Sequence, residues 1–129
     1  MLIKCTAPIR ICDLGGWTDT WFAVSGKVLN IAVFPYVEVL VNISRKKGKQ
    51  PQITIHAENY GDSYNIKANA KNWSKHPLIE AAFSLFNLSP DLRLEVSIFS
   101  EAPAGASTGT SAAVSVAVIG ALDFISGGS

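Results

Sequence analysis

Residues 109–125 restrict the fold of this chain more than any other segment. They are apolar on nearly every side at helical spacing, which predicts a central helix that other elements cover on most sides. Ser115, Gly120 and Asp123 interrupt the run, which is too short to span a bilayer comfortably. The sequence therefore predicts a buried helix within a folded domain and not a membrane span.

The segments before this helix mostly follow strand periodicity. Alternating patterns predict strands over residues 2–7, 27–33, 36–43, 52–58, 64–67 and 92–99, with a long loop over residues 8–26. A helical apolar stripe follows Pro77, which is favoured at a first helical position because its missing N–H has no intrahelical partner there. The basic run 45–49 indicates a solvated hairpin turn. Antiparallel strands with two helices predict an α+β layered fold.

Composition narrows the class of protein. The chain has 129 residues, and 48% of them are apolar, which is enough for the core of one compact domain. Its 11 basic and 10 acidic side chains nearly balance, which argues against a nucleic-acid partner or a polybasic membrane surface. Cys5 and Cys12 fit reduced small apolar residues, because neither has a partner at zinc-site spacing. The N-terminus resembles a strand and not a signal peptide, so we expect a cytoplasmic protein.

The end of the chain suggests that the fold continues in a longer protein. The sequence stops at residues 127–129, directly after the apolar helix. That helix needs more covering than the preceding elements supply, so we expect the chain to be a fragment. Apolar surface left exposed on the helix offers a route to a homodimer.

A loop of small residues separates the last predicted strand from this helix. Residues 101–113 are rich in Gly, Ala, Ser and Thr, which let a backbone approach a ligand closely. The first N–H groups of a helix lack intrahelical acceptors and lie at its positive end, where a polyphosphate binds well. Four hydroxyls can add hydrogen bonds or reach a Mg²⁺ ion: Ser107, Thr108, Thr110 and Ser111. The same composition is also typical of a plain capped connection between strand and helix.

Two other motifs compete for this loop. Residues 105–109, Gly-Ala-Ser-Thr-Gly, match the nucleophile elbow of serine hydrolases, with Ser107 as nucleophile. That motif needs an acid and a His downstream, yet only Asp123 follows, and His56 and His76 both precede it. A Walker A loop requires Lys before its final Ser or Thr, but position 110 is Thr.

Residues 7–20 form a second unusual stretch, just beyond the first predicted strand. Asp19 can accept hydrogen bonds from sugar hydroxyls, and Trp17 can stack on a sugar ring. Arg10 carries a planar guanidinium suited to phosphate oxygens. The simpler alternatives are an exposed turn carboxylate at Asp19 and a core aromatic at Trp17. We assign no role to the two histidines.

Both stretches resemble motifs of the GHMP kinases, a family that includes galactokinase, homoserine kinase and mevalonate kinase. The family pattern Pro-x-Gly-x-Gly-Leu-Gly-Ser-Ser-Ala-Ala is matched at Pro103, Gly105, Gly109, Ser111, Ala112 and Ala113. Ser107, Thr108 and Thr110 depart from it. The resemblance implies that residues 103–111, which include Ala106, wrap the phosphates of ATP and that Ser111 helps to hold Mg²⁺.

The first stretch resembles the start of galactokinase-like proteins. Ala7, Pro8, Arg10, Gly15, Thr18 and Asp19 match that pattern. Residues 15–20, Gly-Gly-Trp-Thr-Asp-Thr, look more like fucose kinases and heptose-phosphate kinases. The resemblance implies that Asp19, with Trp17 and Thr18, binds a sugar and that Arg10 lies near the transferred phosphoryl group.

The resemblance also implies a fold and an activity for the whole chain. The fold is the two-layer α/β domain similar to ribosomal protein S5 domain 2, with a mainly antiparallel sheet and two helices. Residues 1–129 are then the N-terminal portion of the ATP-binding domain, without the C-terminal domain. The implied activity is transfer of the ATP γ-phosphoryl to a sugar or sugar-phosphate hydroxyl, with little turnover by this chain alone. The alternatives from another class are a non-catalytic nucleotide- or sugar-binding module and an inert folded fragment.

Overall fold

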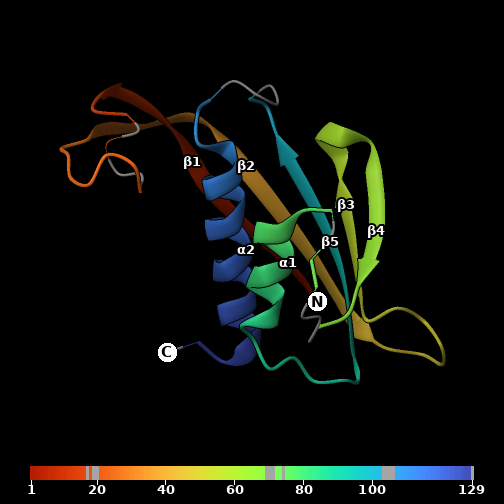
Figure 1. Cartoon of the computed structure of the whole chain (residues 1–129). Coiled ribbons are helices and arrows are strands. Elements are labelled where there is room, and N and C mark those ends of the chain that lie inside the picture. The colour runs from red at the N-terminus through yellow and green to blue at the C-terminus, as the bar shows by residue number, and fades with distance from the viewer. Residues whose placement is uncertain (17, 19–20, 69–71, 74, 103–106, 129) are drawn as a thin grey trace.

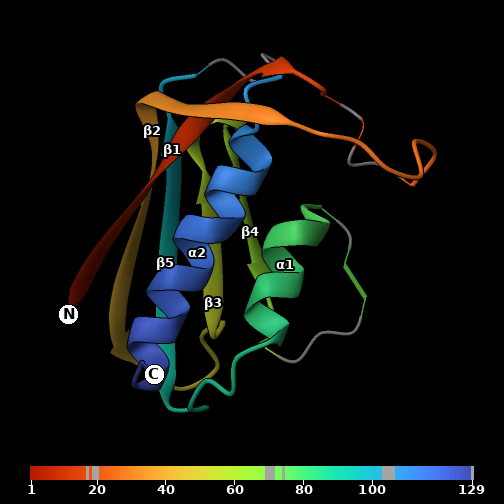
Figure 2. The ribbon, with the colours of Figure 1, turned by 90° about the vertical axis from the view of Figure 1, so that its left-hand side faces the viewer.

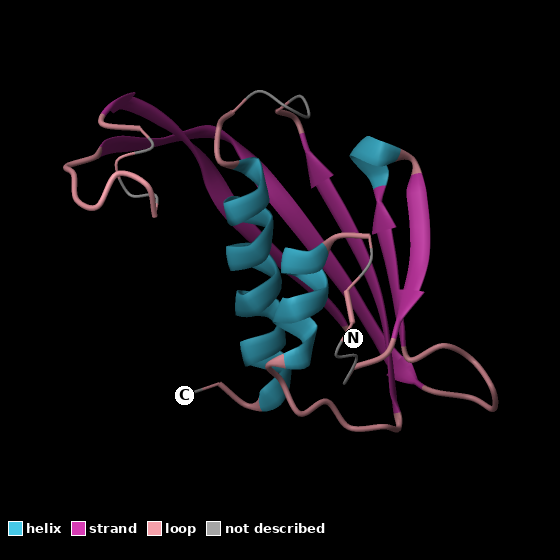
Figure 3. Cartoon of the chain, viewed as in Figure 1, coloured by secondary structure: helices cyan, strands magenta, loops and turns pink. Residues whose placement is uncertain are grey.

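A computed structural model of the chain describes all residues except 17, 19, 20, 69–71, 74, 103–106 and 129 (Figure 1). The elements are β1 (Leu2–Leu14), β2 (Leu29–Arg45), β3 (Ile53–Ala57), a 3₁₀ turn (Glu58–Tyr60), β4 (Asp62–Ile66), α1 (Pro77–Ser84), β5 (Leu92–Ser100) and α2 (Thr110–Ser126). Figure 3 separates the helices from the strands by colour. The predicted α+β class is confirmed.

The strands form one sheet in the order β1-β2-β5-β3-β4. Neighbouring strands are antiparallel except β3 and β5, which are parallel. Both helices lie on the same face of the sheet (Figure 2). The result is the predicted two-layer architecture, with a mainly antiparallel sheet backed by two helices.

Alternating side chains of the central strands build the core between these layers. The residues with the least exposure include Val37, Val39, Val41, Ile53, Ile55, Leu94 and Val96. Each set follows the period of two that the sequence shows, because successive side chains of a strand point to opposite faces. Phe83 of α1 and Leu122 of α2 close the core from the helical side.

The hairpin of β1 and β2 is longer than the sequence predicts. Residues 8–14 extend β1 instead of starting a loop, and residues 27–33 and 36–43 belong to one strand, apart from 27–28. The register passes from Pro8↔Tyr36 to Ile9↔Val33, so the ladder shifts where both strands carry proline. Proline cannot donate to a ladder and is tolerated at such an irregularity. Pairing between the two strands therefore overrides the local loop signals.

The basic run 45–49 is exposed, as predicted, but it is not a hairpin turn. It connects β2 to β3, and β5 lies between these two strands in the sheet. The prediction of a hairpin was wrong because strands that follow each other in sequence need not be neighbours. The later strand β5 inserts between them and pairs with both.

Helix α2 is covered on one side only, which corrects the prediction of a helix covered on most sides. It packs against β1, β2 and α1 through a buried stripe of six residues: Ala113, Val114, Ala117, Val118, Ala121 and Leu122. Val116, Ile119 and Phe124 are exposed on it. The expected apolar surface on this helix is thus present. Within the described part of the chain, no helix is long and apolar enough to cross a membrane.

Candidate functional site

The site predicted from the sequence centres on the start of α2. Gly109 is the N-cap residue and adopts the left-handed conformation, with φ of 68°. Its carbonyl accepts the N–H of Ala113 at 3.0 Å, which begins the helical hydrogen-bond ladder. Among the described residues, no side chain caps this end of the helix. As at every helix N-terminus, the N–H groups of the first turn lack intrahelical acceptors and lie at the positive end of the helix dipole.

Arg10 of β1 lies against this helix start. Its backbone N–H donates to the carbonyl of Thr108 at 2.9 Å. A Cβ atom added at position 109 would come within 2.8 Å of Arg10 Nε and 3.0 Å of Arg10 Cγ. Only a glycine leaves this space and also adopts a positive φ at little cost. The two motifs that the sequence analysis treated separately thus meet at Gly109.

Residues with hydroxyl groups flank Gly109 in the sequence. The Oγ1 atoms of Thr108 and Thr110 lie 3.0 Å apart, within hydrogen-bond distance. Ser107 has a positive φ of 55°, and both Ser107 and Ser111 are exposed. Helix N–H groups, a guanidinium and hydroxyl donors together suit an anion with several oxygens, such as a polyphosphate.

Comparison with known proteins gives a clear result for the fold. No family model and no curated protein sequence matches the chain. Among solved structures, D-glycero-D-manno-heptose 1-phosphate kinase from Bacteroides thetaiotaomicron matches with a TM-score of 0.70 at 21% identity, over 95% of this chain. Homoserine kinase from Cytophaga hutchinsonii matches with a TM-score of 0.61 at 27% identity, over 98% of this chain. A phosphotransferase related to the CoA biosynthesis pathway reaches a TM-score of 0.73 at 17% identity, over the whole chain.

This chain has the fold of the N-terminal part of a GHMP kinase. It spans 41% of the heptose-phosphate kinase chain, 36% of the homoserine kinase chain and 41% of the phosphotransferase chain. The predicted resemblance and fold are therefore confirmed for the portion that the chain covers.

Within this GHMP fold, Thr18 is held by its own loop. Its Oγ1 donates to the carbonyl of Gly15 at 2.5 Å, and its N–H donates to the same oxygen at 3.1 Å. A Cβ atom at Gly26 would come within 2.1 Å of Thr18 Cβ, and one at Gly15 within 1.8 Å of the Lys27 carbonyl. Thr18 Oγ1 also lies 3.5 Å from the carbonyl oxygen of Lys27, so Thr18 contacts both sides of the loop. Its oxygen keeps acceptor capacity for a ligand.

Several predicted site residues lie outside the described part of the GHMP fold: Trp17, Asp19, Pro103, Gly105 and Ala106. The loop next to Asp19 carries two exposed aromatic residues, Trp21 and Phe22, whose ring centroids are 5.7 Å apart. Sequence reasoning missed this pair. The signal was present, because two adjacent aromatic residues follow a Thr-Asp-Thr segment in a loop.

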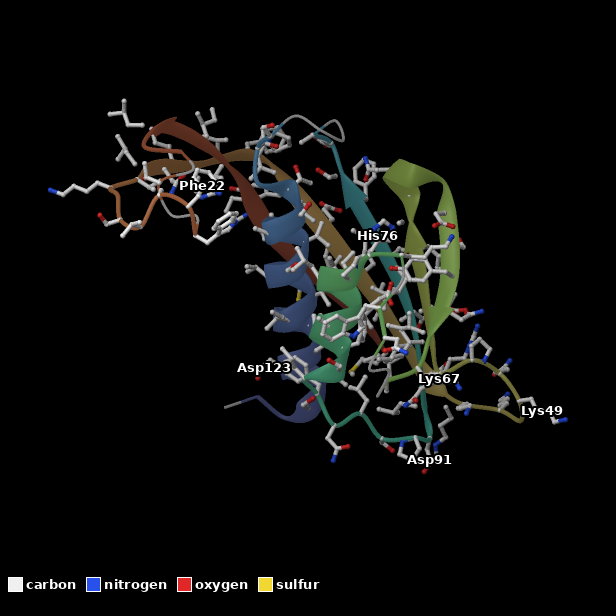
Figure 4. All side chains as sticks on the ribbon, viewed as in Figure 1. Phe22, Lys49, Lys67, His76, Asp91 and Asp123 are labelled. Atoms are coloured by element: carbon white, nitrogen blue, oxygen red, sulfur yellow. The ribbon has the colours of Figure 1, made fainter. Side chains whose placement is uncertain are left out.

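The histidines belong to another part of the GHMP fold. His56 Nδ1 lies 2.8 Å from Ser63 Oγ, across β3 and β4. His76 is the N-cap residue of α1, with its ring 5.6 Å from that of Tyr64 on β4. Figure 4 labels His76 and shows it on the side of the molecule where β3 and β4 lie, with Phe22 beside the β1–β2 hairpin.

The described residues include no cluster of three or more His, Cys, Asp or Glu side chains that suits a metal ion. Mg²⁺ does not require one, since it usually keeps several waters and takes further oxygens from bound phosphates. The exposed hydroxyl of Ser111, in the first turn of α2, fits one ligand position of such an ion.

Proposed function

We propose that this chain is the nucleotide-binding part of an ATP-dependent kinase that phosphorylates a hydroxyl of a sugar or sugar phosphate. The observation that carries the proposal is the contact of Arg10 with Gly109 at the start of α2. Phosphoryl transfer depends on positioning and on stabilising negative charge, and this corner offers a guanidinium beside free helix amides. The fold shared with kinases supports the same reading.

Each predicted residue has a role in this proposal. The backbone of residues 103–111 wraps the phosphates, with the amides of Thr110 and Ser111 directed at their oxygens. Arg10 stabilises the charge that develops on the transferred phosphoryl group. When bound, Mg²⁺ neutralises phosphate charge, and the Ser111 hydroxyl helps to hold it.

The acceptor site is proposed for residues 17–19. Asp19 accepts hydrogen bonds from sugar hydroxyls, and Trp17 packs on the sugar ring. Thr18 fixes the loop through Gly15 and offers its oxygen to the substrate. The fold alone does not select the acceptor, because kinases for homoserine and mevalonate share it. The choice of a sugar rests on the Gly-Gly-Trp-Thr-Asp-Thr segment.

We also propose a cytoplasmic location, where ATP is available. The remaining catalytic groups are proposed to lie in parts of the parent protein that correspond to the uncovered portion of the matched kinases. The chain therefore binds nucleotide but has little activity alone.

Calorimetric titration with ATP and Mg²⁺ tests the proposal on the chain and two matched variants. Arg10→Met removes the guanidinium at Gly109, whereas Arg45→Met removes an exposed guanidinium at the far end of β2. We expect binding by the wild type, at least tenfold weaker binding by Arg10→Met, and unchanged binding by Arg45→Met. Absence of binding at millimolar ATP, or equal affinities in both variants, would refute it.

The nucleophile elbow remains a second candidate because Ser107 adopts a positive φ of 55° within Gly-Ala-Ser-Thr-Gly. Such backbone strain is common at catalytic residues. Labelling with a fluorophosphonate separates the two functions. A hydrolase labels at Ser107, and a Ser107→Ala variant does not, whereas the kinase proposal expects no labelling of either protein.

A further inference from the structure

Asn30 of β2 also contacts the side chain of Arg10. Arg10 Nη1 donates a hydrogen bond to Asn30 Oδ1 at 3.3 Å. The register pairs Arg10 with Ala32 and Cys12 with Asn30. Arg10 and Asn30 are thus diagonal neighbours on the same face of the hairpin, within reach of a long side chain. The contact follows from the register of the two strands.

Three contacts now define the position of Arg10. The Thr108 carbonyl holds its backbone N–H, Gly109 leaves room for Nε and Cγ, and Asn30 binds the terminal Nη1. A guanidinium is planar and presents its donors in a fixed fork. Fixing one terminal nitrogen therefore also fixes the direction of the remaining N–H donors.

The amide at position 30 suits this task better than a carboxylate. An amide oxygen is a neutral acceptor, so it orients the guanidinium without cancelling its charge. An aspartate at the same place would accept the same hydrogen bond but would add a negative charge beside a polyphosphate site. An amide thus leaves the full positive charge of Arg10 available to an anion.

We infer that Asn30 is a positioning residue that orients the Arg10 guanidinium toward a polyphosphate at the start of α2. The inference rests on the proposed function. Asn30 acts through Arg10 and takes no part in contacting the phosphates.

The orientation of Arg10 is tested without any nucleotide. NMR resonances of the Arg10 guanidinium N–H groups are compared in the wild type, Asn30→Ala and Asn42→Ala. Asn42 is an exposed asparagine on the same strand, paired with Leu2 at the other end of β1, so it serves as the matched control. In Asn30→Ala the Arg10 resonances shift and exchange faster with water, and in Asn42→Ala they stay unchanged. Unchanged resonances in Asn30→Ala overturn the inference.

The consequence for binding is tested by titration with ATP and Mg²⁺. Asn30→Ala weakens affinity about three- to tenfold, which corresponds to the net free energy of about one hydrogen bond. Asn30→Asp keeps the Arg10 resonances ordered yet weakens affinity at least as much, and added salt reduces that loss by screening. Asn42→Ala binds like the wild type.

Equal affinities of Asn30→Ala and Asn42→Ala contradict the inference when the wild type binds ATP. If the wild type binds no ATP, the proposed function fails. The guanidinium resonances then decide alone whether Asn30 orients Arg10.

Discussion

Gly109 shows what a single residue contributes to this site. Its left-handed conformation turns the chain into α2, and its missing side chain makes room for Arg10. The sequence predicts a close approach of backbone and ligand at this glycine. It does not predict that an arginine from β1 occupies part of the space, because that contact depends on how the sheet places the two ends of the chain.

Substitution of Gly109 by alanine tests both the left-handed conformation and the space for Arg10. A non-glycine residue in the left-handed region costs about 1–2 kcal/mol of stability. In Gly109→Ala the added Cβ also displaces Arg10, so we expect a larger loss of stability and at least tenfold weaker binding of ATP with Mg²⁺. Urea unfolding and calorimetry measure the two quantities.

Gly48→Ala is the matched control for the backbone cost. Gly48 also has a positive φ, of 57°, but nothing lies within 4 Å of an added Cβ atom. It should lose only the backbone contribution and bind ATP normally. If both variants lost the same stability and bound ATP with the same affinity, the contact between Arg10 and Gly109 would contribute nothing to ATP binding.

At the scale of whole elements, periodicity predicts most of the fold. The period of two identifies the central part of β2, β3 and β5, and the period of 3.6 with Pro77 identifies α1. Two predictions were wrong: residues 8–14 are strand and not loop, and the two strands predicted over 27–43 are one strand, β2. Both errors occur where a proline disturbs the local pattern and pairing between β1 and β2 keeps the strand continuous. The position of β5 between β2 and β3 is a tertiary feature that no local pattern contains.

The connection between β4 and α1 gives a prediction on pH. Lys75 Nζ lies 3.0 and 2.8 Å from the two carboxylate oxygens of Asp62, and this hydrogen bond lowers the pKa of Asp62. A lowered pKa stabilises the fold above the unfolded pKa of about 3.9, and the contribution is lost as pH falls through the folded value. We expect Asp62→Asn to lose less stability on acidification below about pH 4 than the wild type.

Urea midpoints at neutral and acid pH measure this difference. Asp91→Asn, which alters an exposed carboxylate in the turn before β5, serves as the control. Its urea midpoint should fall on acidification as much as that of the wild type. An acid response of Asp62→Asn identical to that of Asp91→Asn would show that the ion pair does not couple to folding.

Helix α2 gives a prediction on assembly. Val116, 63% exposed, and Phe124, 65% exposed, leave apolar surface in solvent. Burial of such surface favours association, so we expect the wild type to form homodimers as its concentration rises. A Val116→Lys, Ile119→Lys double variant should stay monomeric and folded. Light scattering that finds only monomeric wild type would contradict this expectation.

For the whole molecule, the sequence predicts the two motifs of the candidate site, and their resemblance to GHMP kinases implies that they act together. The structure adds their meeting point at Gly109, the fastening of Thr18 to Gly15 and the contact of Asn30 with Arg10. The contacts of Arg10 with Gly109 and with Asn30 join residues far apart in sequence, and the contact with Asn30 requires the register of β1 with β2. Single-sequence patterns carry no information about that register.

The chain alone should have little or no kinase turnover. It spans 41% of the heptose-phosphate kinase that it matches, and phosphoryl transfer requires a complete, well-positioned site. A coupled assay with ATP, Mg²⁺ and fucose, galactose or heptose phosphates measures this directly. Robust turnover would contradict the proposed need for further parts of the parent protein.

The central claim is that the start of α2, with Arg10 across Gly109, holds the phosphates of ATP. NMR mapping of backbone amides during titration with ATP and Mg²⁺ locates the bound nucleotide residue by residue. We predict the largest shifts at the amides of residues 108–112 and at the Arg10 guanidinium, with little change in β3 and β4. Shifts confined to other elements, or no shifts at millimolar ATP, would contradict the claim.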